Sequence, residues 1–188
     1  PVCSSAASDV YKRQGKVYSW YVPLDLVPVY VREGAIVPIR QLTQFVDAEN
    51  PNYLNFFIYP TSKDVGDVTT YQLYQDDKVS TAFEKEEGSM YRVAQIAATK
   101  TSGGRSVQVD YTYGNKSYSP LEEYFYASFL GIESAPSSLT VNGTMLNVES
   151  QNTVESGTST AYYYDSNNQK IVVKVYDDGK DVSIESTS

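Results

Sequence analysis

Histidine is absent from this 188-residue sequence, and cysteine occurs once, as Cys3. Without histidine, the chain holds no Ser-His-Asp or Cys-His nucleophile system and no metal site built on imidazole. A single cysteine forms no internal disulfide, so cysteine usage does not indicate a redox compartment. Glycine-rich phosphate loops, Cys-x-x-Cys pairs and regularly spaced calcium ligands are also missing. The sequence therefore predicts no cofactor and no metal site.

Long apolar runs and clusters of basic residues are lacking as well. No stretch approaches the roughly 18 to 20 apolar residues of a membrane helix, and no signal-peptide core lies near the start. The formal net charge is −8, and the 15 Lys and Arg residues are scattered along the chain. A surface that binds nucleic acid needs such residues in clusters. We therefore expect neither a membrane segment nor a nucleic-acid partner.

Tyrosine is over-used, with 18 residues against 6 Phe and 1 Trp. Together with abundant Thr, Ser and Val, this is a β composition, and helix signals are almost absent. Short strands at regular spacing indicate a β-sandwich, with hairpin turns at Ser102-Gly103-Gly104 and Asn142-Gly143. The expected strands include residues 53–59, 69–77, 90–99, 106–113, 123–132, 161–164, 170–176 and 181–185.

Residues 1–14 fit nothing that follows, because they show neither helical nor strand periodicity. They look like the translated adapter sequence that begins many metagenomic reading frames. A native disordered leader is the alternative. On either interpretation they are left out of the fold prediction.

The segment 23–39 is predicted to form a strand, a tight turn and a second strand. Its apolar runs, Leu26–Val31 and Ala35–Val37, lack polar alternation, so each is expected to be covered on both faces. Gly34 belongs to the turn, and Pro38 should end the second strand. Asp25 and Arg32 are candidates for a charge pair that fixes the turn.

Two segments are specific enough to compare with known families. Residues 23–38 read Pro-Leu-Asp, two residues, Pro-Val-Tyr-Val-Arg, one residue, Gly-Ala-Ile, one residue and Pro. Residues 73–78 read Leu-Tyr-Gln-Asp-Asp-Lys and are followed by Ser80, Phe83 and Gly88. Both resemble the C-terminal β region of family 31 glycoside hydrolases, the α-glucosidase and α-xylosidase family. There the second segment reads Leu-Tyr-Glu-Asp-Asp-Gly, so Gln75 and Lys78 depart from it, and Lys78 implies a strained or altered turn.

The resemblance implies an all-β fold class: a distal β-sandwich over residues 49–188, preceded at 15–48 by the last strands of a second, proximal sandwich. It implies the non-catalytic C-terminal part of a retaining α-glycosidase, which hydrolyses or transfers α-linked glucosyl units. The family's catalytic Asp residues lie on a (β/α)₈ barrel of roughly 250 residues. This chain has neither the length nor the helices for it, so no catalytic residue is assigned and the chain alone is expected to be inactive. The expected partners are the upstream barrel and carbohydrate, in a secreted or periplasmic protein.

Structural or interface roles are expected for Trp20, Asp25, Arg32, Gly34, Asp76 and Asp77. The acidic pairs Asp76-Asp77, Glu122-Glu123 and Asp177-Asp178 are interpreted as solvated turns, because neighbours on a strand point to opposite faces.

Carbohydrate binding is a second hypothesis. Tyr162, Tyr163 and Tyr164 are its main candidates, beside Tyr111 with Tyr113 and Tyr124 with Tyr126, because a tyrosine offers a ring face for stacking and a hydroxyl. Half-buried strand positions explain the same tyrosines without any ligand. A stand-alone carbohydrate-binding or adhesin-like module therefore remains the alternative function. A domain that supports a barrel should instead expose a large apolar patch when the barrel is missing.

Overall fold

The computed structural model describes residues 19, 21–42, 53–61, 63–76, 81, 84 and 90–188. The chain divides into two compact units, Pro1–Arg32 and Glu33–Ser188. The described part of the first unit contains no strand or helix. Its one turn lies at Leu24-Asp25, where the backbone N–H of Leu26 donates to the carbonyl oxygen of Pro23.

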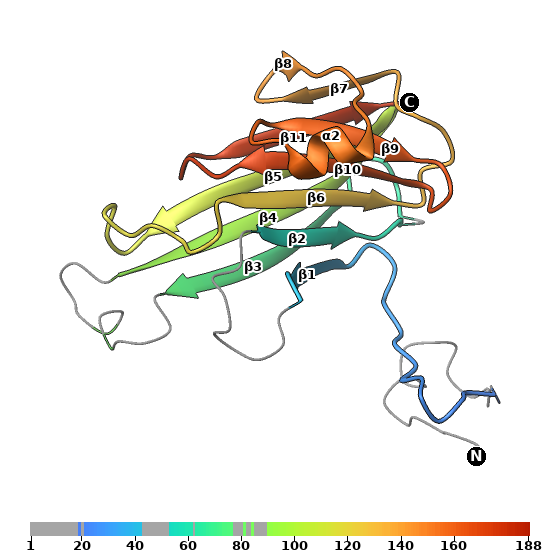
Figure 1. Ribbon diagram of the computed structural model, residues 1–188, viewed down its shortest axis with the longest axis horizontal. Helices are drawn as coiled ribbons and strands as arrows, with labels where there is room; N and C mark the ends of the chain where they lie inside the picture. The colour runs from blue at the N-terminus through green and yellow to red at the C-terminus, as the bar shows by residue number, and fades with distance from the viewer. Residues whose placement is uncertain are drawn as a thin grey trace. The chain divides into compact units, whose positions relative to one another are not determined.

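The second unit is a sandwich of two sheets, as the sequence predicted (Figure 1). Neighbouring strands are antiparallel except for the parallel pair β2 and β6. The five-stranded sheet runs β1 (Ile36–Arg40), β2 (Tyr53–Ile58), β6 (Tyr124–Leu130), β10 (Lys170–Tyr176) and β9 (Ala161–Asp165). The six-stranded sheet runs β3 (Val68–Asp76), β4 (Tyr91–Thr101), β5 (Gly104–Tyr113), β11 (Val182–Thr187), β7 (Ser138–Val141) and β8 (Thr144–Met145).

The hydrophobic core lies between the two sheets and follows the period-two alternation of the strands. On β6, Phe125, Ala127 and Phe129 face this core, while Tyr124, Tyr126 and Ser128 lie on the opposite face. The strand predicted over residues 123–132 is therefore confirmed, and its side chains alternate between the two faces. Both faces of β6 are buried nonetheless, so something covers the outer face of the five-stranded sheet.

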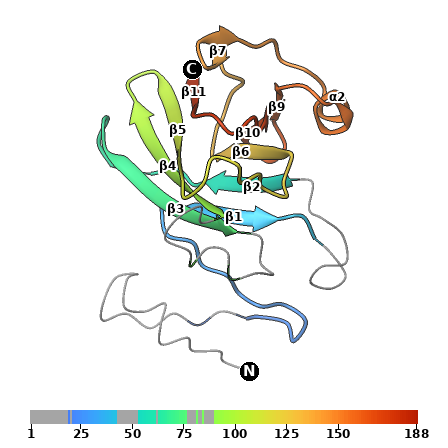
Figure 2. The same ribbon diagram turned by 90° about the vertical axis from the view of Figure 1, so that its left-hand side faces the viewer.

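That cover is the six-residue helix α2 (Gln151–Ser156), which the sequence analysis did not predict. Ser150 caps its N-terminus by accepting a hydrogen bond from the backbone N–H of Thr153. Val154 of the helix packs against Tyr126, Tyr163 and Val172 in a second, smaller apolar cluster. In Figure 2, α2 lies beside β9 and β10, on the side of their sheet away from β4 and β5.

Both predicted hairpin turns are present. Thr101 pairs with Gly104 across the turn between β4 and β5. Asn142 and Gly143 have φ angles of 51° and 75° between β7 and β8, which are the left-handed values that a two-residue hairpin turn requires. Gly34 also has a positive φ, of 72°, and its N–H donates to the carbonyl oxygen of Pro60. A side chain there would be strained, which explains the glycine.

The strand predicted over Leu26–Val31 is wrong. These residues form no strand, and Val27 and Val29 are about as exposed as a free chain, at 81% and 80%. Pro28 interrupts the run and removes a backbone donor, which disfavours a paired strand. Pro38 does not end the next strand either. It lies inside β1, which is an edge strand with no neighbour on its other side among the described residues.

The predicted domain boundary between residues 48 and 49 does not coincide with a break in the fold. β1 comes before it and β2 after it, yet the two strands pair in one sheet, with Ile36 opposite Ile58 and Arg40 opposite Leu54. The compact unit begins at Glu33. Residues 43–52 lie outside the described residues, and local composition does not distinguish a connection within one sheet from a domain linker.

Candidate functional site

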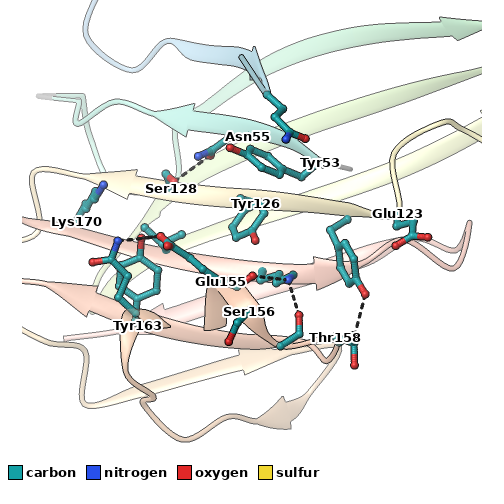
Figure 3. Close-up of a pocket in the computed structure, with 16 residues that line it drawn as sticks. Tyr53, Asn55, Glu123, Tyr126, Ser128, Glu155, Ser156, Thr158, Tyr163 and Lys170 are labelled. Atoms are coloured by element: carbon teal, nitrogen blue, oxygen red, sulfur yellow. Dashed lines mark hydrogen bonds between the residues drawn. The ribbon is translucent and has the colours of Figure 1, made fainter. Parts of the chain in front are cut away.

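An open groove of about 560 Å³ runs along the outer face of the five-stranded sheet, next to α2 (Figure 3). Its side chains come from alternate positions of β2, β6 and β10, which share one face of the sheet. The end of β1, α2 and the turn that follows α2 add further lining residues. The lining is rich in tyrosine, amide, hydroxyl and carboxylate groups.

Two tyrosine rings occupy the middle of the groove. The rings of Tyr53 and Tyr126 meet edge to face, with their centroids 5.0 Å apart and their planes at 73°. Tyr126 is only 8% exposed, and burial raises its pKa to about 12. Its hydroxyl forms no hydrogen bond with any described residue, although it opens into the groove. A donor and acceptor is therefore available there at neutral pH.

Lys174 lies beneath the wall of the groove with only 4% of its surface exposed. Its ammonium group donates to the carbonyl oxygen of Gly157 at 2.6 Å, just beyond the end of α2, and lies 4.2 Å from the centroid of the Tyr124 ring. Burial lowers the pKa of Lys174, against the opposing charge of Glu155. Lys174 therefore holds the last turn of α2 against β10 and β6.

Hydrogen bonds fix the remaining polar side chains. The buried hydroxyl of Ser128 donates to Asn55 Oδ1 at 2.9 Å, which leaves the Asn55 amide nitrogen without a partner among the described residues. Glu155 Oε1 accepts hydrogen bonds from the Tyr163 hydroxyl and from the Gln151 side-chain amide. Glu155 Oε2 accepts no hydrogen bond from a described residue. Figure 3 shows these groups around one depression, with donors and acceptors on both sides.

We expect Lys174→Met to loosen α2 while changing global stability little. Methionine removes the donor to Gly157 but also removes a buried charge, and such exchanges are often neutral overall. Amide hydrogen exchange should therefore become faster at Val154 and Gly157, whose N–H groups bond to Ser150 and Thr153. Lys170→Met is the matched control, because Lys170 contacts Asp165 at 3.7 Å and not the helix. Unchanged exchange at Val154 and Gly157 would contradict this role of Lys174.

The tyrosine triplet 162–164 does not form a stacking platform. Tyr162 and Tyr164 face the core between the sheets, while Tyr163 faces the opposite side beneath α2. Tyr162 and Tyr163 are both buried, so their ring faces are closed to a ligand. Neighbouring side chains on a strand point to opposite faces. The tyrosines that share the face of the groove are therefore identified by this alternation and not by the local density of tyrosine. Tyr124 and Tyr126, two residues apart, do line the groove, and of the triplet Tyr163 alone joins them there.

A second polar cluster links the two sheets at one end of the sandwich. Arg92 on β4 is 2% exposed and forms a two-pronged ion pair with Asp177, at 3.0 and 2.5 Å. Burial alone would lower the pKa of Arg92, but the hydrogen bonds and charge of Asp177 outweigh it and raise the pKa above its ordinary value. The ring of Tyr111 lies 4.2 Å from the guanidinium carbon.

Gln75 joins this pair to another one. Its Oε1 accepts from Arg92 at 2.8 Å, and its Nε2 donates to Glu122 at 3.0 Å. Arg40 on β1 completes the chain by an ion pair with Glu122. We call this set, Arg40, Gln75, Arg92, Glu122 and Asp177, the inter-sheet network.

Several site predictions need correction or fall outside the described residues. Glu122 and Asp177 have buried side chains that form ion pairs. The prediction that the acidic pairs Glu122-Glu123 and Asp177-Asp178 are solvated turns is therefore wrong for these two residues. Asp25 and Arg32 are both described, and no ion pair joins them. Asp76 ends β3, and its carbonyl oxygen accepts from the Tyr118 hydroxyl at 3.1 Å. Trp20, Asp77 and Lys78 lie outside the described residues.

The described residues include no group of three or more Cys, Asp or Glu side chains placed to hold a metal ion. Within the same residues, no helix has the length and apolar character needed to span a membrane. The two carboxylates of the inter-sheet network are buried and paired with guanidinium groups, that of Arg92 buried and that of Arg40 exposed at the surface. They therefore lack the open position that a catalytic acid or nucleophile requires.

The solved structures that are similar to this chain include three carbohydrate-active enzymes. The family GH31 dextranase from Flavobacterium johnsoniae, solved with glucose, matches with a TM-score of 0.80 and 20% identity over 96% of this chain. The α-1,4-glucan lyase from Gracilariopsis lemaneiformis, solved as a covalent intermediate, matches with a TM-score of 0.72 and 22% identity over 94%. The cycloalternan-forming enzyme from Listeria monocytogenes, solved with a pentasaccharide substrate, matches with a TM-score of 0.62 and 19% identity over 93%. No protein-family model matches the chain.

This chain has the fold of one part of the family 31 glycoside hydrolases. It spans 22%, 18% and 15% of the lengths of the three proteins, respectively. The resemblance predicted from residues 23–38 and 73–88 is therefore confirmed at the level of the fold, as is the all-β sandwich.

Proposed function

We propose that this chain is the non-catalytic β region of a retaining α-glycosidase of family 31, whose catalytic barrel is encoded upstream. The proposal rests on two numbers: the share of this chain that matches the similar enzymes, and the share of each enzyme that this chain spans. Nearly all of this chain matches, but it spans only 15% to 22% of the three similar enzymes. The parent protein would hydrolyse or transfer α-linked glucosyl units, and this region would support the barrel mechanically.

The first unit offers a second line of support. Its described side chains include large apolar groups that are exposed to an unusual degree for a folded domain: Tyr21, Leu24, Leu26, Val27 and Val29. A run of this kind marks a surface that normally contacts another protein part. The exposure of these side chains is explained if they normally pack against an apolar face of the proposed catalytic barrel.

The proposal predicts that the 188-residue chain alone has no glycosidase activity. The chain should release no product from p-nitrophenyl α-glucoside, maltose or isomaltose, because its buried carboxylates are tied to Arg40 and Arg92. The assay follows chromophore or glucose release against a family 31 enzyme as positive control. Measurable turnover that survives repurification would overturn the non-catalytic role.

The adhesin-like alternative makes a different prediction. A self-sufficient module needs no partner for residues 21–29, so the chain should stay monomeric and free of hydrophobic-dye binding. The proposed function instead predicts dye binding that disappears when these apolar residues are replaced by serine or lysine. A fluorescence titration with such a dye distinguishes the two.

A further inference from the structure

We propose that the groove on the outer face of the five-stranded sheet binds a neutral oligosaccharide. The outer face of a sandwich sheet is ordinarily solvated and polar. Here it holds instead a hollow of about 560 Å³ with partly buried tyrosines at its centre. The size is typical of small-ligand sites, and the lining is more polar than most such sites, which suits a ligand that carries many hydroxyl groups.

The free hydrogen-bonding groups of the groove match the hydroxyls of a sugar. Tyr126 offers a hydroxyl with no partner among the described residues, Asn55 offers its amide nitrogen, and Glu155 offers Oε2. A sugar hydroxyl both donates and accepts, so each of these groups finds a complement. Ser128 and Tyr163 already hold Asn55 and Glu155 in place, so little side-chain ordering remains to oppose binding.

The charges of the groove favour a neutral ligand. Glu123 and Glu155 are balanced by Lys170 and Lys174. Lys174 is committed to the carbonyl oxygen of Gly157, and Lys170 lies 3.7 Å from Asp165. Neither cation is therefore free to bind an anion, and the chain's net charge of −8 adds to the repulsion.

Tyr53 supplies the ring surface. It is half-buried in the groove, and its edge-to-face contact with Tyr126 fixes the orientation of the ring. In Figure 3 the two rings lie next to each other, with Asn55 and Ser128 on one side of them. The apolar face of a pyranose ring can lie on such a side chain while its hydroxyls reach Asn55 and Tyr126.

The test is a calorimetric titration of the full chain with maltotetraose and with isomaltotetraose. We expect saturable binding of at least one of them. Tyr126→Phe removes only the unpartnered hydroxyl and should weaken binding about threefold to tenfold with unchanged stability. Tyr53→Ala should weaken it about tenfold. The matched control is Tyr91→Phe. Tyr91 lies on β4 of the six-stranded sheet, away from the groove, and its ring stacks on Tyr74 of the same sheet.

The outcomes separate cleanly. Binding that Tyr126→Phe weakens and Tyr91→Phe leaves intact supports the site. No saturable binding of either saccharide, or equal binding by the two Phe variants and the unaltered chain, overturns it. A charged polymer that binds more tightly than both saccharides also overturns it. This titration measures binding and not enzymatic activity, so its result is independent of the proposed non-catalytic support of a barrel.

Discussion

Replacing Arg92 by methionine is expected to cost about 3 to 5 kcal/mol of folding free energy. Methionine keeps much of the volume but leaves the Asp177 carboxylate, whose side chain is 3% exposed, without its cation. Gln75 loses the donor to its Oε1, and Tyr111 loses the guanidinium over its ring. A buried charge without a partner is among the few changes that destabilise a domain this strongly.

Chemical denaturation measures the effect through the shift in midpoint at constant slope. Lys180→Met is the control, because its ion pair with Asp178 is exposed and should contribute nothing measurable. The double variant Arg92→Met with Asp177→Asn should be more stable than Arg92→Met alone, since the stranded charge is gone. A loss below about 1 kcal/mol for Arg92→Met would show that the inter-sheet network does not support the sandwich.

Replacing Gln75 by glutamate is expected to cost about 2 kcal/mol near neutral pH. The Gln75 amide is both acceptor for Arg92 and donor to Glu122, at 2.8 and 3.0 Å. A carboxylate keeps the first role and loses the second, and it places two negative charges side by side. Glutamine is thus the residue that suits this position, although the related family motif has glutamate there.

The cost of Gln75→Glu should depend on pH. We expect repulsion from Glu122 to outweigh the attraction of Arg92, whose charge is already paired with Asp177, and so to raise the pKa of the introduced carboxyl in the folded state above its unfolded value of about 4.3. Below about pH 4 it is protonated in both states and can donate to Glu122 much as the amide does. As the pH rises, the unfolded chain releases this proton first, so the deficit relative to the unaltered chain grows until the raised folded pKa is passed.

Denaturation midpoints at about pH 4 and about pH 7.5 test this dependence. Gln75→Met serves as the uncharged control: it loses both hydrogen bonds, so it should be destabilised, but by the same amount at the two pH values. A deficit for Gln75→Glu that stays constant between them would contradict the placement of Gln75 against Glu122.

Much of the sandwich could be predicted from sequence because its strands carry local signals. The alternation of residues 123–132 assigns each side chain of β6 to the correct face, and Asn142-Gly143 marks a hairpin through backbone conformation alone. Such features depend on near neighbours in the chain. They are therefore visible without any knowledge of the partners in space.

The groove and the inter-sheet network depend on distant residues and were largely missed. Arg92 and Asp177 are 85 positions apart, and Arg40 and Glu122 are 82 apart. No local sequence pattern predicts such pairs. α2 was overlooked because six residues are too few for a periodic signal, although Ser150 is a recognisable cap. Tyrosine density pointed to residues 162–164, whereas strand pairing brings Tyr53 beside Tyr126.

In the exposed segment 21–29, by contrast, a local signal led to a wrong prediction. Its apolar residues predicted a buried strand, but Leu24, Val27 and Val29 are strongly exposed. Pro28 removes one backbone donor and so weakens any strand pairing of this segment.

The sequence of the gene upstream of the codon for Gly15 tests the central claim most directly. The account predicts an open reading frame that continues upstream for several hundred residues, with the strand and helix alternation of a (β/α)₈ barrel and two catalytic Asp motifs. A secretion signal directly before Gly15 would contradict it, because no catalytic domain would then remain for this sandwich to support.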